Sequence, residues 1–324
     1  MTKRKGLMAV LLAMVVLVAG SVTSDARRGD RGERRGQATR VYTLPANAGN
    51  PEGVAFNRRT GAFYVSEARP GSDGQSGRVW RGTLRDPTLE EFLPPDPARP
   101  ASVGLKVHRG RLYIAGGQEG TVEVRRLSDK SLVARFALCE GCFVNDLAVA
   151  RNGDVFATES LQAPQVIYRI PASSVDAGGG PVDPITVTPP VTPAAGFNDN
   201  GIVLTRRDRF AIFVQSNTGK LFRLNTRTRQ TREITVSGGE LTNGDGLVLR
   251  GRTLYVVRNQ NELIAKAKLN GRLTRARVVK QVTDPTFEDP TTAALARGRL
   301  LVVNSDFFPP PQGPPFTVSR IKTP

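Results

Sequence analysis

The sequence contains few of the residues on which most redox and nucleophilic sites depend. Its 324 residues include one histidine, His108, and two cysteines, Cys139 and Cys142. A Ser-His-Asp triad would have to use His108, which lies in the strand-like segment "LKVHRGRLY" and is interpreted as a structural or surface residue. Copper and iron redox sites favour imidazole and thiolate ligands, so that chemistry is not expected either.

Acidic residues are also scarce beside basic ones. The chain has 29 Asp and Glu against 46 Lys and Arg, a formal net charge of +17. Most of the Arg residues are scattered singly, without the interleaved aromatic residues that are typical of single-stranded nucleic-acid binding. Nucleic acid is therefore not an expected partner.

The two cysteines form the motif "CEGC". A zinc site would need further ligands, which one histidine and no other cysteine cannot supply. A thioredoxin-type centre would need a βαβ context that the surrounding sequence lacks. In an exported chain, we expect Cys139 and Cys142 to form a small structural disulfide.

The first 26 residues have the layout of a secretory signal peptide. Lys3, Arg4 and Lys5 precede an apolar stretch over residues 6–20, and small residues follow in "SVTSDA". The apolar stretch is short for a bilayer span, so cleavage near Ser24 or Ala26 is predicted, with no membrane span after processing. The excess of Arg over Lys fits a bacterial source with high GC content, so a secreted bacterial protein is expected.

Residues 27–39 form a Gly- and Arg-rich segment. We interpret it as a basic flexible arm that is solvated, and an anionic cell-surface polymer is the partner that its charge would suit.

The rest of the chain, residues 40–324, repeats one pattern six times. Each copy reads as strand, short turn, strand, and a third strand such as "GRVWRGTL" or "GKLFRLNT" follows it. Several copies add a fourth, more polar strand. Four antiparallel strands every forty to fifty residues are typical of a β-propeller blade, so we predict an all-β, six-bladed β-propeller. The last copy lacks a fourth strand, and "RVYTLP" from Arg40 is expected to join it and close the ring.

The residue that opens each innermost strand can be compared across the six copies. These positions converge around the axis of a propeller and are occupied by Glu52, Ala101, Asn145, Asn200, Asp245 and Thr291. Two carboxylates and two amides among them suit a divalent cation, most simply Ca²⁺, which prefers oxygen ligands. Taken singly, each of these residues is equally typical of a turn.

The segments "PEGVAF", "VNDLAV", "DNGIVL" and "GDGLVL" resemble the metal-binding positions of the calcium-dependent six-bladed propeller hydrolases, the senescence marker protein/gluconolactonase group. The resemblance implies that Glu52, Asn145, Asn200 and Asp245 coordinate the ion, and that Asp245 is also the base or nucleophile. Asp146 and Asp199, next to these ligands, are expected to hydrogen bond around the site rather than to bind the ion.

Two positions depart from the sugar lactonases of that group. Phe143 stands where they tend to have Arg, and Val54 stands where they tend to have Pro. A less polar lactone or ester is therefore expected at least as much as a sugar-acid lactone.

The predicted function is a secreted, monomeric hydrolase that acts on a lactone, ester or phosphotriester, a small molecule bound in an axial pocket. The alternative is a non-catalytic secreted propeller that binds a cell-wall polymer or protein partner and holds a structural calcium. This alternative would use Pro- and Gly-rich rim loops, over residues 177–196 and 307–315, to bind the partner. The first loop lies just before Asn200, where it would form a lid or a partner surface.

Overall fold

The computed structural model describes residues 38–308 and 313–324. The predicted signal peptide lies outside these residues, and so does the predicted arm except for residues 38 and 39. No helix in the described part of the chain is long and apolar enough to cross a membrane.

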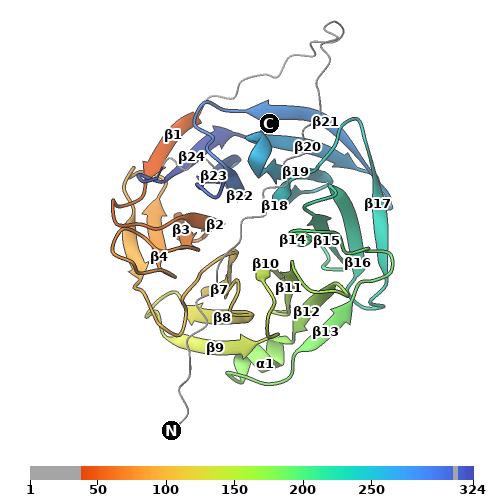
Figure 1. The fold of residues 1–324 in the computed structure, drawn as a ribbon, viewed down its shortest axis with the longest axis horizontal. Coiled ribbons are helices and arrows are strands. Elements are labelled where there is room, and N and C mark those ends of the chain that lie inside the picture. Colours follow the sequence, from red (N-terminus) through yellow and green to blue (C-terminus); the bar gives the residue numbers. More distant parts are fainter. Residues whose placement is uncertain (1–37, 309–312) are drawn as a thin grey trace, which may run out of the picture. The chain divides into compact units, whose positions relative to one another are not determined.

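The described chain is a ring of four-stranded antiparallel blades, which confirms the predicted six-bladed β-propeller (Figure 1). Blade 1 consists of β2 (Pro51–Phe56), β3 (Ala62–Glu67), β4 (Val79–Thr83) and β5 (Glu90–Leu93). Blade 2 consists of β6 (Leu105–His108), β7 (Arg111–Ala115), β8 (Thr121–Arg126) and β9 (Leu132–Ala137). Blade 3 consists of β10 (Val144–Val149), β11 (Val155–Glu159), β12 (Val166–Ile170) and β13 (Asp183–Thr186).

The second half of the ring repeats this order. Blade 4 consists of β14 (Asp199–Leu204), β15 (Phe210–Gln215), β16 (Lys220–Asn225) and β17 (Thr231–Ser237). Blade 5 consists of β18 (Gly244–Arg250), β19 (Thr253–Arg258), β20 (Leu263–Leu269) and β21 (Arg275–Thr283). Blade 6 consists of β22 (Pro290–Ala296), β23 (Arg299–Asn304), β24 (Thr317–Lys322) and β1 (Ala38–Thr43). The helices are short, α1 (Ala172–Asp176) and the 3-10 helix η1 (Asn259–Asn261).

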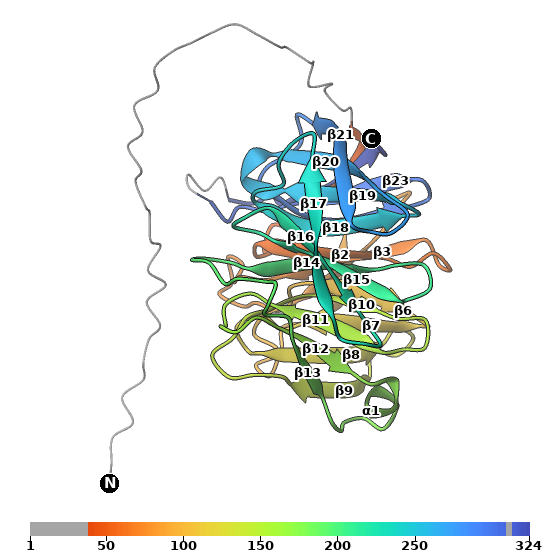
Figure 2. The ribbon, with the colours of Figure 1, turned by 90° about the vertical axis from the view of Figure 1, so that its right-hand side faces the viewer.

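The ring closes as predicted, through a strand from the start of the propeller. β1 pairs antiparallel with β24, from Ala38 opposite Ile321 to Thr43 opposite Thr317. This pairing covers the outer edge of β24, which would otherwise expose unpaired backbone groups. Seen from the side of blades 4 and 5 (Figure 2), β17 and β21 also touch through a short parallel pairing between Thr235–Ser237 and Arg275–Arg277.

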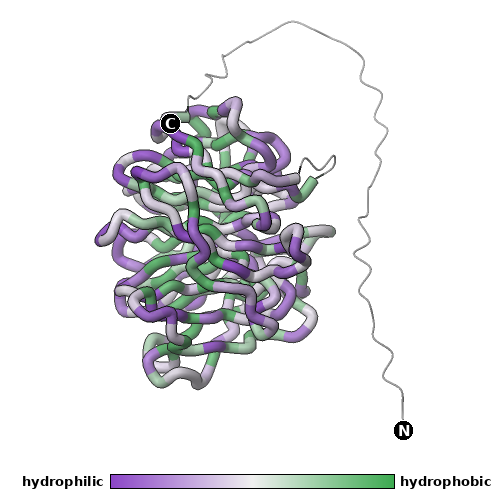
Figure 3. Tube along the Cα trace, turned by 90° about the vertical axis from the view of Figure 1, so that its left-hand side faces the viewer, coloured by the Kyte–Doolittle hydropathy of each residue, from purple (hydrophilic) through white to green (hydrophobic). Residues whose placement is uncertain are grey.

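Apolar side chains from adjacent blades pack face to face between the blades. Phe213 and Phe222 of blade 4, for example, stack at 5.5 Å between ring centroids within the cluster that blade 4 shares with blade 3. Hydrophobic stretches run through the body of the ring, and many connecting loops are hydrophilic (Figure 3). In the loop between β9 and β10, Cys139 and Cys142 form the predicted disulfide.

The expectation of a rim loop over residues 177–196 is wrong in part. This segment contains β13, the fourth strand of blade 3, and its Ile185, Val187 and Val191 are buried against blade 4. β13 is an edge strand, where Pro184 removes no hydrogen-bond donor that the sheet needs. A composition rich in Pro and Gly therefore concealed a strand.

Tyr42 tests whether closure by β1 holds the propeller together. Its side chain is fully buried between blades 6 and 1, contacts Phe63 edge to face at 4.9 Å, and donates a hydrogen bond to Leu84 O at 3.2 Å. Tyr42→Ala should lower the free energy of unfolding by about 3–5 kcal/mol, the usual cost of deleting a large buried ring. Denaturant unfolding measures this, with the exposed Thr39→Ala as the control. Equal stability of both variants would show that β1 is dispensable.

Candidate metal site at the propeller axis

The innermost strands share one irregularity, which lies where the candidate ligands are. In β2 the pairing with β3 shifts by one residue between Pro51 and Val54, so Glu52 and Gly53 oppose a single residue of β3. The same shift occurs in β10, β14, β18 and β22. Such a bulge takes a residue out of the ladder and redirects its side chain. The bulged pairs are Glu52-Gly53, Asn145-Asp146, Asn200-Gly201, Asp245-Gly246 and Thr291-Thr292.

The second residue of the bulge is often glycine because the next blade lies too close for a side chain. A Cβ atom on Gly201 would lie 2.2 Å from Asp245 O, and one on Gly53 would lie 2.3 Å from Val103 O. Neither glycine has a positive φ. The Asn200-Gly201 pair is therefore not a hairpin turn: the glycine admits the neighbouring strand, and Asn200 occupies the bulge.

Hydrogen bonds between blades identify the equivalent position in blade 2. Thr158 Oγ1 donates to Asn200 O at 2.6 Å, and Thr291 Oγ1 donates to Glu52 O at 2.7 Å. In the same way, Ser66 Oγ donates to Val103 O at 2.6 Å. The position in blade 2 is thus Val103, and the expectation of Ala101 is wrong. Ala101 and Val103 are two residues apart, so their side chains would lie on the same face of a strand. The apolar pattern of the sequence therefore cannot distinguish between these two positions.

The four predicted ligands are all buried, with 8% or less of each residue exposed: Glu52, Asn145, Asn200 and Asp245. Neighbouring side chains fix two of them. Asn145 Nδ2 donates to Ser160 Oγ at 3.0 Å, and Asn259 Nδ2 donates to Asp245 Oδ2 at 3.0 Å. The Asn200 amide of blade 4 also acts on Asp245 of blade 5, whose pKa it lowers.

Asp146 connects three blades. Its Oδ1 accepts a salt bridge from Lys106 Nζ of blade 2 at 2.7 Å, and its Oδ2 accepts a hydrogen bond from the Ile202 backbone N–H of blade 4 at 3.2 Å. Sequence reasoning missed Lys106, although a signal exists. At its position the other five inner strands carry only Ala or Val. A single lysine in that apolar layer marks a special contact.

The carboxylates at the axis carry negative charge that the described residues do not balance. Glu52 Oε2 is buried without a hydrogen-bond partner in the described part of the chain. Burial raises the pKa of Glu52 well above its usual value, the charges of Asp245 and Asp146 raise it further, and Lys106 lowers it. Burial also raises the pKa of Asp245 to about 8, although the Asn259 hydrogen bond opposes that shift.

Three carboxylates and one ammonium group leave two formal negative charges at this place. A divalent cation would offset them, and Ca²⁺ takes carboxylate and amide oxygens as ligands. The residues present therefore fit the predicted ion, with Glu52, Asn145, Asn200 and Asp245 as the donors. No group of three or more His, Cys, Asp or Glu side chains is arranged to hold a metal within residues 38–308 and 313–324. The predicted set combines two carboxylates with two amides.

Asp199 has a different environment from Asn200 beside it. Its carboxyl group is fully buried, and neither oxygen has a hydrogen-bond partner among the described residues. Burial raises its pKa well above the usual value, and the charge that adds to this is that of Glu159. Glu159, at the end of β11 in blade 3, is thus the charged group that acts on Asp199. The only histidine of the sequence, His108, is the last residue of β6. It therefore lies at the end of β6 that is away from Val103, the blade 2 equivalent of the candidate ligands.

Two phenylalanines form an aromatic wall on blades 3 and 4, at the end of these blades where the bulges lie. Phe143 and Phe197 meet edge to face at 5.1 Å between ring centroids, and Phe197 is 44% exposed. They precede the candidate ligands Asn145 and Asn200 by two and three residues. The loop before Phe197 is held by Asn198, whose side chain bonds both the N–H and the C=O of Ala194 at 2.9 Å.

Comparison with known structures shows the same fold. The chain resembles the luciferin-regenerating enzyme with a TM-score of 0.60 and 11% identity, over 87% of this chain and 95% of that one. It resembles the calcium-binding protein regucalcin from Agrobacterium tumefaciens with a TM-score of 0.59 and 15% identity, over 87% and 97%. Virginiamycin B lyase from Staphylococcus aureus gives 0.56 and 13%, over 88% and 99%. No family model and no curated protein matches the sequence.

A substitution at Asn200 tests whether this residue is a metal ligand or only shapes the strand. Asn200→Ala should weaken Ca²⁺ binding at least tenfold, because it removes one of four protein donors, while the propeller stays folded. Isothermal titration calorimetry measures the affinity, and circular dichroism monitors the fold. The control is Asn152→Ala, an exposed residue in the turn between β10 and β11. Unchanged Ca²⁺ affinity in Asn200→Ala would reduce Asn200 to a structural residue.

The pKa of Asp245 predicts how the stability of the calcium-free protein depends on pH. Because the folded-state pKa of about 8 exceeds that of an unfolded Asp, the folded state binds more protons. This contribution to stability is complete below about pH 4 and is lost as the pH rises through 8. In EDTA, the stability of the wild type should therefore fall relative to Asp245→Asn across this range. Parallel curves would contradict the prediction, and Ca²⁺ should stabilise the wild type most at high pH.

Proposed function

We propose that the protein is an exported, metal-dependent hydrolase that acts on a lactone, an ester or a phosphotriester at the propeller axis. The metal ligands are Glu52, Asn145, Asn200 and Asp245, and the substrate is a small molecule with an apolar group. Ca²⁺ is the ion that this set of oxygen donors suits best.

The observation that carries the proposal is the pair of buried axial acids, Glu52 and Asp245, with which no cationic side chain in the described part of the chain forms a salt bridge. Two other buried acids of the propeller do lie beside arginines: Glu67 pairs with Arg78 at 3.2 Å, and Glu123 pairs with Arg99 at 3.0 Å. Glu52 and Asp245 have no such partner in the described part of the chain. A buried charge is costly unless it is paired or coordinates a metal, so this arrangement supports a cation site.

The chain's own residues would perform distinct tasks in the reaction. A divalent cation held by these residues would supply Lewis-acid polarisation of the substrate's carbonyl or phosphoryl oxygen. Asp245 is the axial carboxylate that can take a proton from an attacking water or attack directly. Asn259 bonds Asp245 Oδ2 and so orients the other oxygen of that carboxylate.

The aromatic wall supports a substrate with an apolar group. Phe143 and Phe197 present ring surface at the mouth beside Asn145 and Asn200, where apolar contact would exclude water from a bound substrate. No arginine stands at the position of Phe143 to hydrogen bond the hydroxyl groups of a sugar. Two of the similar structures are named as enzymes and one as a calcium-binding protein. The shared fold is compatible with either role.

Hydrolysis of a substrate panel tests the proposal. With excess Ca²⁺, we expect turnover of aryl esters or of lactones with apolar side chains, and weaker turnover of sugar-acid lactones. Asp245→Asn should reduce kcat/KM by at least about 100-fold, the usual effect of losing a general base. Chelation with EDTA should abolish the activity, and added Ca²⁺ should restore it.

Calorimetry on the same samples separates binding from catalysis. If the wild type binds Ca²⁺ but turns over no substrate in the panel, the second candidate function gains support, a propeller that binds a partner and holds a structural ion. One observation favours that candidate: cavities of about 300 Å³ and 180 Å³ lie on blade 4, away from the axis. Calcium binding without hydrolysis would therefore favour blade 4 as the surface that binds a partner.

A further inference from the structure

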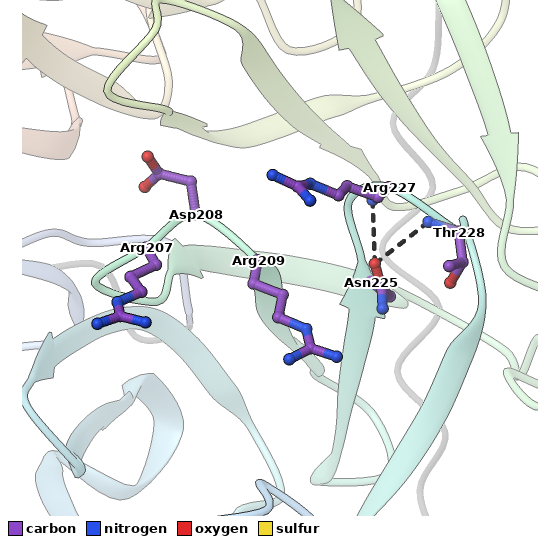
Figure 4. A pocket seen from close by; sticks show the side chains of 6 residues that line it. All are labelled: Arg207, Asp208, Arg209, Asn225, Arg227 and Thr228. Carbon is purple, nitrogen blue, oxygen red and sulfur yellow. Dashed lines mark hydrogen bonds between the residues drawn. The ribbon is translucent and has the colours of Figure 1, made fainter.

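Blade 4 carries a cluster of arginines around two adjoining cavities. The larger cavity, of about 300 Å³, and the smaller one, of about 180 Å³, share Arg209 and Asn225 as lining residues. The turn before β15 supplies Arg207, Asp208 and Arg209, and the end of β16 with the turn after it supplies Asn225, Arg227 and Thr228 (Figure 4). Both turns lie at the opposite end of the strands from the bulges. The cluster is therefore separate from the axial site.

The positive charge in this cluster has almost no internal counterion. Asp208, the one carboxylate that lines the cavities, already pairs with Arg151 at 3.1 Å outside them. Within residues 38–308 and 313–324, no ion pair involves Arg209, Arg223 or Arg232. These guanidinium groups are thus free to bind an anion.

The strand register forces two of these arginines together. Arg223 of β16 lies directly opposite Arg232 of β17 in the antiparallel ladder. Like charges in that position destabilise a sheet. Burial lowers the pKa of Arg223, and the charges of Arg232 and Arg209 lower it further. An anion bound between the arginines would remove this repulsion.

The guanidinium groups are also held in place. The Phe210 ring lies under Arg209 at 5.3 Å and under Arg223 at 4.9 Å from its centroid. Stacking of this kind fixes the guanidinium plane and leaves its N–H edge for an oxyanion. Arg223 Nε is buried without a hydrogen-bond partner in the described part of the chain. That donor therefore has no hydrogen-bond acceptor among the described residues.

We propose that the two adjoining cavities of this arginine cluster, lined by Arg209, Arg223, Arg232 and Arg227, bind a ligand with two or more consecutive phosphate groups. Arginine forks match the geometry of phosphate oxygens. Two cavities that share Arg209 provide adjacent places for two such groups. The backbone N–H groups of Arg227 and Thr228 already donate to Asn225 Oδ1, at 3.0 and 3.2 Å, which fixes the turn between them.

Calorimetry with sodium tripolyphosphate and with inorganic phosphate tests this site in the calcium-free full-length protein. Tripolyphosphate should bind at least tenfold more tightly than inorganic phosphate, and added NaCl should weaken both. Arg209→Gln/Arg223→Gln should abolish most of this preference. The matched control is Arg58→Gln/Arg59→Gln, which removes the same charge from an exposed turn of blade 1.

A thermal melt of each variant without ligand guards against misfolding. Arg223→Gln should melt at or above the wild-type temperature, because it relieves the repulsion from Arg232. Equal affinity for tripolyphosphate and inorganic phosphate would contradict a site for two consecutive phosphate groups. An equal loss of tripolyphosphate affinity in the blade 1 control would show that binding depends only on the net charge of the protein. Tighter binding of a single-stranded oligonucleotide than of tripolyphosphate, lost in Arg209→Gln/Arg223→Gln, would replace the proposed ligand by nucleic acid.

Discussion

The close approach of the innermost strands at one end of the ring is the constraint on which the candidate site depends. The strands come so near that a Cβ atom on Gly246 would lie 2.1 Å from Thr292 Oγ1. A bulge relieves the crowding by taking one residue out of each ladder. The residue before the crowded position then has its side chain redirected, and five blades repeat this geometry. The ring of candidate ligands is a consequence of how a propeller closes at its centre.

Most of the fold could be predicted from the sequence because each blade repeats a local signal. Alternation of apolar residues and short turns marks the strands, and "RVYTLP" marked the strand that closes the ring. The same local signals could not separate Val103 from Ala101, since both positions satisfy the alternation. They also could not reveal β13, because the composition around Pro184 resembles a loop. Contacts between distant segments decide both cases.

The candidate site could likewise be predicted from the sequence only in part. Glu52, Asn145, Asn200 and Asp245 were accessible to comparison of the repeats, because each occupies one position in its blade. Lys106 and Asn259 were not, since their importance lies in what they touch: Asp146 at 2.7 Å and Asp245 at 3.0 Å. A salt bridge between blades depends on the closed ring. The metal-binding role of the four residues remains a prediction that the structure makes physically reasonable through uncompensated charge.

The two ends of the strands carry opposite unbalanced charge, and this separates the two proposed sites. At the bulges, carboxylates exceed the one nearby lysine, so a cation is favoured there. At the far end of blade 4, Arg223 and Arg232 face each other without a carboxylate, so an anion is favoured. Each group of like charges costs stability in the free protein, and each cost would fall when a ligand binds. A phosphate ligand on blade 4 would also leave the axial mouth open, since Phe197 and Arg209 lie at opposite ends of β14 and the turn that follows it. The two proposed sites would therefore not compete with each other for a ligand.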